Sequence, residues 1–172
     1  MFAYDPYAEL ATLREFTPLT LTSTDITHGE PMAKAQWGAA GGGTDTSPQL
    51  SWSGAPEGTK SFSVSCFDPD APTGSGYWHW AVYDIPATVT SLDTGSAGKG
   101  IGTLLRNESG TFDFVGAGPP PGTGVHRYFF VVDALDVEHL DITPEVTPAI
   151  LGFNRHFHSL ARGILAPTAT SD

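Results

Sequence analysis

The order of the apolar patterns along the chain constrains its fold most strongly, because strand-like runs follow one another before a single helix-like run. Period-two or continuously apolar patterns, which are typical of strands, occupy residues 19–24, 61–68, 78–85 and 127–135. Residues 149–164 instead repeat apolar side chains at spacings of three and four. A run of strands disfavours a doubly wound parallel sheet. The pattern predicts a mainly β protein, a sandwich with one helical appendage near the C-terminus.

Two of these runs predict particular surroundings. Phe62, Val64 and Cys66 alternate with serines, so they should share one face of their strand. The unbroken apolar run from Tyr128 to Val132 is typical of a strand at the centre of a sheet. Cys66 is the only cysteine, so it forms no internal disulfide, and in an apolar run it is predicted to be a small buried hydrophobe.

The helix-like run has a recognisable start. Thr147 can cap it, and Pro148 suits its first turn. Its apolar positions are Ile150, Phe153, Phe157, Leu160 and Ile164. These signals predict a helix over residues 149–164.

Length and composition indicate one domain. The 172 residues include 20 glycines and 14 prolines, which implies many turns between short elements. We interpret residues 1–172 as a single domain, in which residues 1–15 are an N-terminal extension and residues 166–172 a flexible tail. Residues 1–17 contain neither a signal-peptide pattern nor a membrane span, so a cytoplasmic location is expected.

The charge balance excludes several partners. Nineteen acidic residues against eight basic ones give a net charge of −11. This field repels nucleic acid and anionic membrane surfaces at long range. We therefore expect no nucleic-acid partner and at most peripheral contact with a membrane.

Two glycine-rich stretches invite comparison with phosphate-binding loops. The second, residues 95–102, lacks the Gly-Lys-Ser/Thr ending of a P-loop. We predict that it and the first stretch, residues 39–43, are mobile surface loops.

Three segments place polar side chains beside rigid turn residues at strand ends: 68–72, 77–80 and 118–128. Proline fixes the backbone and glycine lets it approach a ligand closely, so such loops can form a small concave site. Asp68 and Asp70 lie on either side of Pro69, and one can brace the loop while the other points into a cavity. The sequence leaves open which of the two does which.

Histidines occupy two of these segments. On a strand with alternating faces, His79 should point away from the neighbouring Trp78 and Trp80. A lone strand histidine is more often a structural residue than a ligand. His126 and Tyr128 lie two residues apart, hence on one strand face, directly after a loop rich in backbone N–H groups. This pair is the stronger functional signal.

Taken together, Asp-Pro-Asp-Ala-Pro at 68–72, His-Trp at 79–80 and Gly-Pro-Pro-Pro-Gly-Thr-Gly-Val-His-Arg-Tyr at 118–128 resemble the phosphatidylethanolamine-binding protein family. The resemblance spans roughly residues 16–165, and it is specific because three motifs must coincide in order and spacing. The chain looks like the bacterial branch often labelled Raf-kinase-inhibitor-like. The resemblance implies a sandwich of antiparallel sheets with short peripheral helices and a small anion pocket at one end.

The resemblance also implies the residues of that pocket. They would be Asp68, His79, His126, Tyr128 and Gly118, with Pro69 and Pro72 as a rigid wall. The end of the chain departs from the bacterial pattern, because the expected Gly-Thr-Tyr-Glu type ending is missing after Gly163. Nothing after Leu165 resembles the helix that covers the pocket in animal members, so a more open mouth is expected.

Such a pocket would bind a small anionic or zwitterionic phosphate ligand without a cofactor or metal. Imidazoles, the Tyr128 hydroxyl and backbone N–H groups can all donate to a phosphate. Asp68 would either orient a histidine or meet the ammonium of a headgroup such as phosphoethanolamine. A kinase or protease partner and a homodimer are implied by the resemblance alone.

Catalysis is the alternative interpretation. A metal-dependent or phosphate-ester hydrolase could use Asp68, His79 and His126, a two-histidine, one-carboxylate set. Asp68 and Asp70 also resemble the carboxylate pair of haloacid dehalogenase-type phosphatases. That chemistry needs a parallel α/β sheet, which the run of strands disfavours. We therefore expect a binding protein and no catalytic residues.

Overall fold

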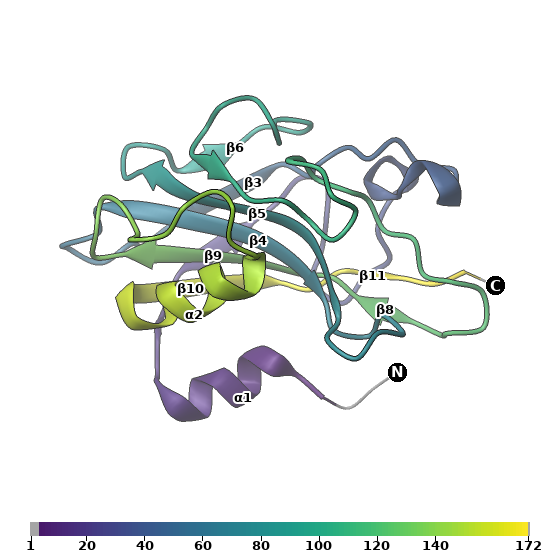
Figure 1. The fold of residues 1–172 in the computed structure, drawn as a ribbon, viewed down its shortest axis with the longest axis horizontal. Helices are drawn as coiled ribbons and strands as arrows, with labels where there is room; N and C mark the ends of the chain where they lie inside the picture. Colours follow the sequence, from purple (N-terminus) through teal and green to yellow (C-terminus); the bar gives the residue numbers. More distant parts are fainter. Residues whose placement is uncertain (1–3, 172) are drawn as a thin grey trace.

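The computed structural model describes residues 4–171, whose helices and strands form a layered molecule (Figure 1). The helical segments are α1 (Pro6–Leu13), α2 (Pro148–His158) and the 3₁₀ turns η1 (Lys34–Gln36) and η2 (Ala39–Gly41). The strands are β1 (Thr17–Pro18), β2 (Thr20–Thr22), β3 (Leu50–Ser53), β4 (Ser61–Asp68), β5 (Tyr77–Pro86), β6 (Ser91–Leu92), β7 (Thr103–Leu104), β8 (His126–Arg127), β9 (Phe129–Leu135), β10 (Ser159–Leu165) and β11 (Thr168–Ala169).

The strands form a larger and a smaller sheet that face each other. The larger sheet has the order β1-β10-β9-β4-β5-β7, and the smaller has the order β2-β3-β6. Neighbouring strands are antiparallel except β1 and β10, which form a short parallel pair. A separate pair joins β11 to β8. This arrangement confirms the predicted mainly β sandwich with peripheral helices.

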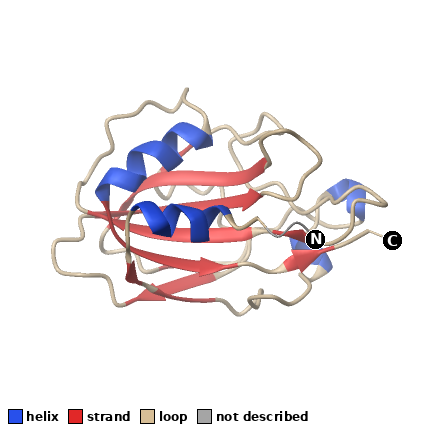
Figure 2. Cartoon of the chain, turned by 90° about the horizontal axis from the view of Figure 1, so that it is seen from below, coloured by secondary structure: helices blue, strands red, loops and turns tan. Residues whose placement is uncertain are grey.

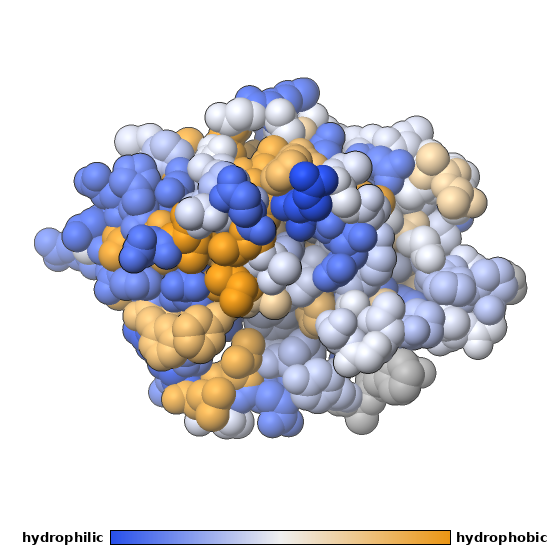
Figure 3. Space-filling model, viewed as in Figure 1, coloured by the Kyte–Doolittle hydropathy of each residue, from blue (hydrophilic) through white to orange (hydrophobic). Residues whose placement is uncertain are grey.

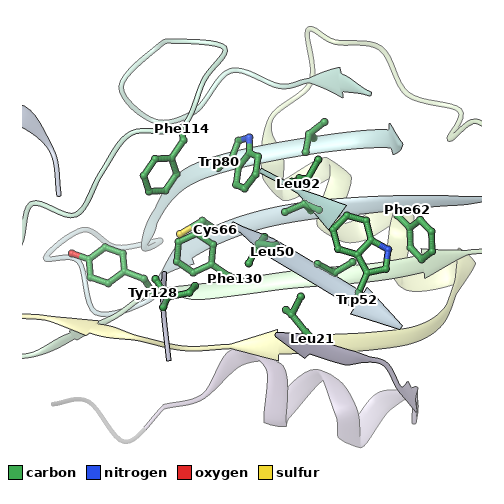
Figure 4. Close-up of a cluster of buried hydrophobic side chains, with 14 of the residues drawn as sticks. Leu21, Leu50, Trp52, Phe62, Cys66, Trp80, Leu92, Phe114, Tyr128 and Phe130 are labelled. Carbon is green, nitrogen blue, oxygen red and sulfur yellow. The ribbon is translucent and has the colours of Figure 1, made fainter. Parts of the chain in front are cut away.

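The principal hydrophobic core fills the space between the two sheets (Figure 4). From β4 it receives Phe62, Val64 and Cys66, which share one face as their alternation predicts. Leu50 and Trp52 enter it from β3 on the opposite sheet. Cys66 is fully buried, and this burial raises the pKa of its thiol well above the usual value. The cysteine therefore packs as a small hydrophobe.

The outer face of the larger sheet is covered by α1 and α2 (Figure 2). Tyr7 of α1 packs on Phe129 of β9, with ring centroids 5.4 Å apart, and Leu151 of α2 packs on Leu135. Every residue of β9 is buried, which confirms the prediction of a central strand. Because helices cover this face, the serines of β4 are buried as well.

The predicted helix over residues 149–164 was too long. The structure ends α2 at His158, and the following residues form β10 along the edge of β9. Thr147 occupies the N-cap position, but its hydroxyl makes no capping hydrogen bond. The edge of β9 needs a partner for its backbone N–H and C=O groups, and this requirement outweighs the local helical pattern. A helix followed by a strand therefore replaces the single helix.

The apolar stripe predicted for α2 faces the surface of the molecule and not its core. Leu151 and Arg155 are buried, whereas Ile150, Phe153 and Phe157 are between 43% and 64% exposed. The buried positions include a charged residue, which an apolar pattern cannot identify. The aromatic residues of α2 consequently lie at the surface, beside α1.

The end of the chain is part of the fold rather than the flexible tail predicted for residues 166–172. The register of β11 with β8 places Thr168 opposite Arg127 and Ala169 opposite His126. The Pro167 carbonyl accepts a hydrogen bond from the Tyr128 N–H at 2.9 Å. Residue 172 itself lies outside the described residues. The atypical ending thus supports the strand that carries His126.

We expect Gly152→Ala to raise the free energy of unfolding by about 0.5–1 kcal/mol, because glycine disfavours a helix interior. An added Cβ at Gly152 would meet only a Trp78 ring carbon, at 3.9 Å. Urea unfolding measures the change. Gly54→Ala is the matched control: it also has open space but a φ of +82°, so it should destabilise. A less stable Gly152→Ala variant would contradict the prediction.

Candidate functional site

A cavity of about 430 Å³ opens at one end of the sandwich. At this end β4 finishes and β5 and β8 begin (Figure 1). We call the cavity the anion pocket, after the ligand class that the sequence resemblance implies. Among the residues singled out in the sequence, it brings together Asp68, Pro72, His79, Gly118, His126 and Tyr128. Pro69 does not line it. Asp68 and His126 are 58 residues apart in the chain and meet here because β4 ends where β8 begins.

Asp68, the last residue of β4, holds the centre of the pocket. Its side chain is 4% exposed. One carboxylate oxygen accepts the Asp70 N–H at 2.8 Å, and the other lies 2.8 Å from Nδ1 of His126. Burial raises the pKa of Asp68, although the hydrogen bond and charge of His126 act in the opposite direction. Asp68 therefore both braces its own turn and orients the histidine.

The second ring nitrogen of His126 reaches the glycine-rich loop. Its Nε2 lies 2.8 Å from the Thr123 hydroxyl, which itself lies 2.6 Å from the Pro120 carbonyl oxygen. A hydroxyl has only one proton, so if Thr123 donates to Pro120, Nε2 must donate to Thr123. Nδ1 donates to the Asp68 carboxylate at the same time. This pattern is complete when His126 is an imidazolium, and a ligand oxygen can replace Thr123 as the acceptor.

A β-bulge places His79 in the pocket. Along β5, Trp80 pairs with Cys66 and Trp78 pairs with Phe67, so His79 is an extra residue without a partner in β4. Trp80 therefore joins the core, while Trp78 lies on the opposite face, with its ring 4.4 Å from that of Phe67. The expectation that strict alternation turns His79 away from both indoles was wrong, because alternation is interrupted here.

His79 is held as a neutral base. Its Nδ1 lies 2.8 Å from the carbonyl oxygen of Val115, and its ring lies between those of Tyr77 and Tyr128. Burial lowers the pKa of His79 to about 4. At neutral pH it thus contributes an aromatic wall and a hydrogen bond, and it carries no charge.

Tyr128 brings a buried hydroxyl to the same cavity. The residue is 1% exposed, and its hydroxyl has no hydrogen-bond partner among the described residues. Figure 4 shows the hydroxyl pointing away from the hydrophobic cluster. Burial, followed by the charge of Asp68, raises the pKa of Tyr128, which therefore stays protonated. A buried donor without a partner is costly, so this group is available to a ligand.

Asp70 braces the loop and does not point into the cavity. Its carboxylate binds the guanidinium of Arg127 at 2.7 and 2.8 Å and accepts the Arg127 N–H at 2.9 Å. Arg127 also donates to the carbonyl of Tyr4 at 2.6 Å. Asp70 is therefore a brace between the 68–72 turn and β8, and it is not available as the partner carboxylate of a phosphatase.

One wall of the pocket was not predicted. Within residues 39–43, expected to be a mobile loop, Ala39–Gly41 form η2 and line the cavity. Asp45 fixes them, because its carboxylate accepts the N–H groups of Ala39 at 3.2 Å and Gly116 at 2.7 Å. Gly43 packs directly on Trp37, where a Cβ would lie 2.0 Å from the backbone oxygen. The run of glycines was the sequence signal for this wall, because the close contact at Gly43 requires a residue without a side chain.

The chemical character of the pocket follows from its lining. Within the described residues it contains no lysine or arginine, and its carboxylates are Asp45 and Asp68. Donors converge from the His126 ring and the Tyr128 hydroxyl. No cluster of three metal-ligating side chains occurs in residues 4–171. The arrangement suits hydrogen bonding to a small polar ligand.

The fold and this site define a β-sandwich protein with a carboxylate–histidine pocket at one end. The family description "phosphatidylethanolamine-binding protein" matches residues 22–170. The chain belongs to this family, as its three motifs indicated.

Two bacterial proteins and one further structure are similar to it. The YbhB protein of Escherichia coli is 44% identical over 83% of this chain and 94% of its own length. The crystal structure of Escherichia coli YbcL superposes with a TM-score of 0.85 at 38% identity, covering 91% of this chain and all of YbcL. A homologue from Chlamydia trachomatis superposes with a TM-score of 0.78 at 29% identity, covering 91% of this chain and 99% of its own.

None of the helices in residues 4–171 has the length and apolar character needed to cross a bilayer.

Proposed function

We propose that the anion pocket binds phosphate or a phosphorylated headgroup such as phosphoethanolamine, without catalysis. The observation that carries the proposal is the chain of contacts from Asp68 through His126 to Thr123, which fixes the orientation of the His126 ring at the pocket. A charge-assisted hydrogen bond from this ring to a phosphate oxygen is stronger than a neutral one. The unpaired Tyr128 hydroxyl offers a second donor.

The lining favours a zwitterion over a free anion. Asp68 lies beside the donors, and the pocket has no arginine or lysine to neutralise a dianion. An ammonium group can meet the Asp68 carboxylate and the aromatic faces of Tyr77 and Tyr128. The family name records phosphatidylethanolamine as a ligand of relatives, and its headgroup has this zwitterionic character. We therefore expect phosphoethanolamine to bind more tightly than phosphate.

The test is a titration with phosphate and with phosphoethanolamine, followed by protein NMR. His126→Ala should weaken binding of both ligands at least about tenfold, because a hydrogen bond to a charged group contributes about 1.5–3 kcal/mol. His139→Ala is the control, since this imidazole is 80% exposed and pairs only with Asp84 at the surface. Unchanged binding by His126→Ala would refute the proposed site.

One further variant tests the ligand class. Asp68→Asn should reduce the preference for phosphoethanolamine over phosphate. If the preference is unchanged in this variant, the carboxylate does not recognise an ammonium group.

A further inference from the structure

A second cavity, of about 410 Å³, lies between α1 and α2 on the outer face of the larger sheet. We call it the helix groove. Its walls are almost entirely apolar and include Tyr7, Leu10, Trp78, Phe153 and Phe157. Figure 3 shows apolar side chains gathered over the two helices. Its volume lies within the range of small-molecule sites, which is about 300–1,000 Å³.

The helix groove is distinct from the anion pocket. The ends of β4 and β5 separate the two cavities, because adjacent residues on these strands point to opposite faces. Phe67 and Trp78 line the groove, while their neighbours Asp68 and Tyr77 line the pocket. A ligand of the groove therefore needs none of the groups that form the pocket.

Two buried arginines border this apolar space. Arg155 and Arg162 line the groove, and their side chains are 2% and 7% exposed. Both pair with the same carboxylate, Asp133, at 3.3 and 2.8 Å. Within residues 4–171, Asp133 is the only carboxylate with which either arginine forms an ion pair. The cluster of Asp133, Arg155 and Arg162 thus contains one negative and two positive charges. One further anion would neutralise it.

Three side-chain nitrogens of residues that line the groove also lack hydrogen-bond partners. Among the described residues, Nε of Arg155, Nη1 of Arg162 and Nδ1 of His156 are buried and have no hydrogen-bond partner. Buried polar groups in folded proteins nearly always have partners, and an unpaired charged donor is especially costly. The three nitrogens belong to residues that line one cavity. An acceptor supplied by a ligand would satisfy them.

The distribution of charge strengthens this reading. Two of the eight basic residues of the chain line the groove, and a third, Arg14, donates to the carbonyl of His156, a lining residue, at 2.5 Å. The chain as a whole carries a charge of −11. A small highly charged anion is repelled by that field and gains nothing from apolar walls. A single negative charge attached to a long apolar tail fits both the arginines and the walls.

We propose that the helix groove binds an amphipathic monoanion of the fatty-carboxylate class. The carboxylate accepts hydrogen bonds from the unpaired nitrogens of Arg155 and Arg162, and completes the charge balance with Asp133. The alkyl chain lies between α1 and α2 and covers the exposed ring of Phe153, which is 64% exposed without it.

Dodecanoate, kept below its micellar concentration, is the probe for this proposal. Trp78 lines the groove, so its fluorescence should report saturable binding, and calorimetry should give one site per chain. Dodecanoate should bind at least about tenfold more tightly than dodecanol, which has the same tail and no charge. Dodecyltrimethylammonium, with the opposite charge, should bind more weakly than either.

Variants at Gly152 test the position of the tail without breaking the fold. A side chain built there meets only Trp78, at 3.9 Å, so it grows into the groove. Gly152→Leu should reduce dodecanoate affinity at least about tenfold, while Gly152→Ala, the matched control, should retain most of it. Circular dichroism and urea unfolding should show both variants folded.

Three results would overturn the proposal. Equal affinity for dodecanol and dodecanoate would mean that the arginines recognise no anion, and wild-type affinity in Gly152→Leu would place the ligand elsewhere. A dimer in sedimentation that persists with dodecanoate and dissociates in Phe153→Ser would show that a second copy occupies the groove. His126→Ala should bind dodecanoate normally, so failure of the anion pocket and failure of the groove are distinguishable.

Discussion

Asp133→Asn is expected to lower the free energy of unfolding by about 3–5 kcal/mol, because it removes the charge that two buried arginines share. Asp133 is fully buried on β9, and its carboxylate pairs with Arg155 and Arg162 and accepts the Ser159 hydroxyl. Asparagine has the same shape but no charge. Both guanidiniums would then be buried without an ionic partner, which is the costly way to break such a cluster.

Equilibrium unfolding in urea measures this loss. The control is Asp136→Asn on the same segment, whose carboxylate is 46% exposed and pairs with His158 at 2.9 Å. Exposed pairs contribute about 0–1 kcal/mol, so this variant should stay within that range. If the two variants lost equal stability, the cluster between α2 and the sheet would not have the role assigned to it.

Acidification from about pH 6.5 to about pH 4 should cost the protein about 3 kcal/mol of stability through His79 alone. The ordinary pKa of 6.5 is lowered to about 4 in the folded state because the ring is buried. Each pKa unit corresponds to about 1.4 kcal/mol. Between these two values the unfolded chain binds a proton that the folded chain excludes, so stability is complete above pH 6.5 and is lost as the pH falls.

Urea unfolding at several pH values tests this dependence, and His79→Gln provides the comparison. Glutamine cannot titrate and can still donate to the Val115 carbonyl. The variant should lose most of the slope between about pH 4 and pH 6.5. The raised pKa of Asp68 acts in the opposite direction at the acid end, and it is present in both proteins. A wild-type slope in His79→Gln would assign the acid sensitivity to another group.

The strands were predictable where burial imposes a simple period. Alternating residues over 61–68 matched β4, and the continuous apolar run matched the first half of β9. The helix was overextended because residues 159–165 continue an apolar spacing of three and four, while their backbone pairs with β9. Pairing over a sequence distance of about 30 residues is not visible in a local pattern. The same limit hid β11, whose partner is β8.

The site residues that lie within the sequence motifs were predictable. Those contributed by distant segments of the chain were not. His126 and Tyr128, two residues apart after a glycine-rich loop, do line one cavity. His79 lines it for a reason that alternation misses, namely the bulge in β5. Asp45 was missed because its role is to accept N–H groups from Ala39 and from Gly116, which lies 71 residues away. Only the folded chain brings these together.

Both ends of the described chain converge on β8, since Tyr4 binds Arg127 from one end and β11 pairs with Arg127 and His126 from the other. For protein engineering this means that a fluorophore attached at Tyr4 or Thr170 would sit next to β8, the strand that carries His126. An attachment that must stay far from β8 belongs at the turn at Glu57–Gly58, just before β4. The eight residues of that strand place it about 25 Å from Asp68.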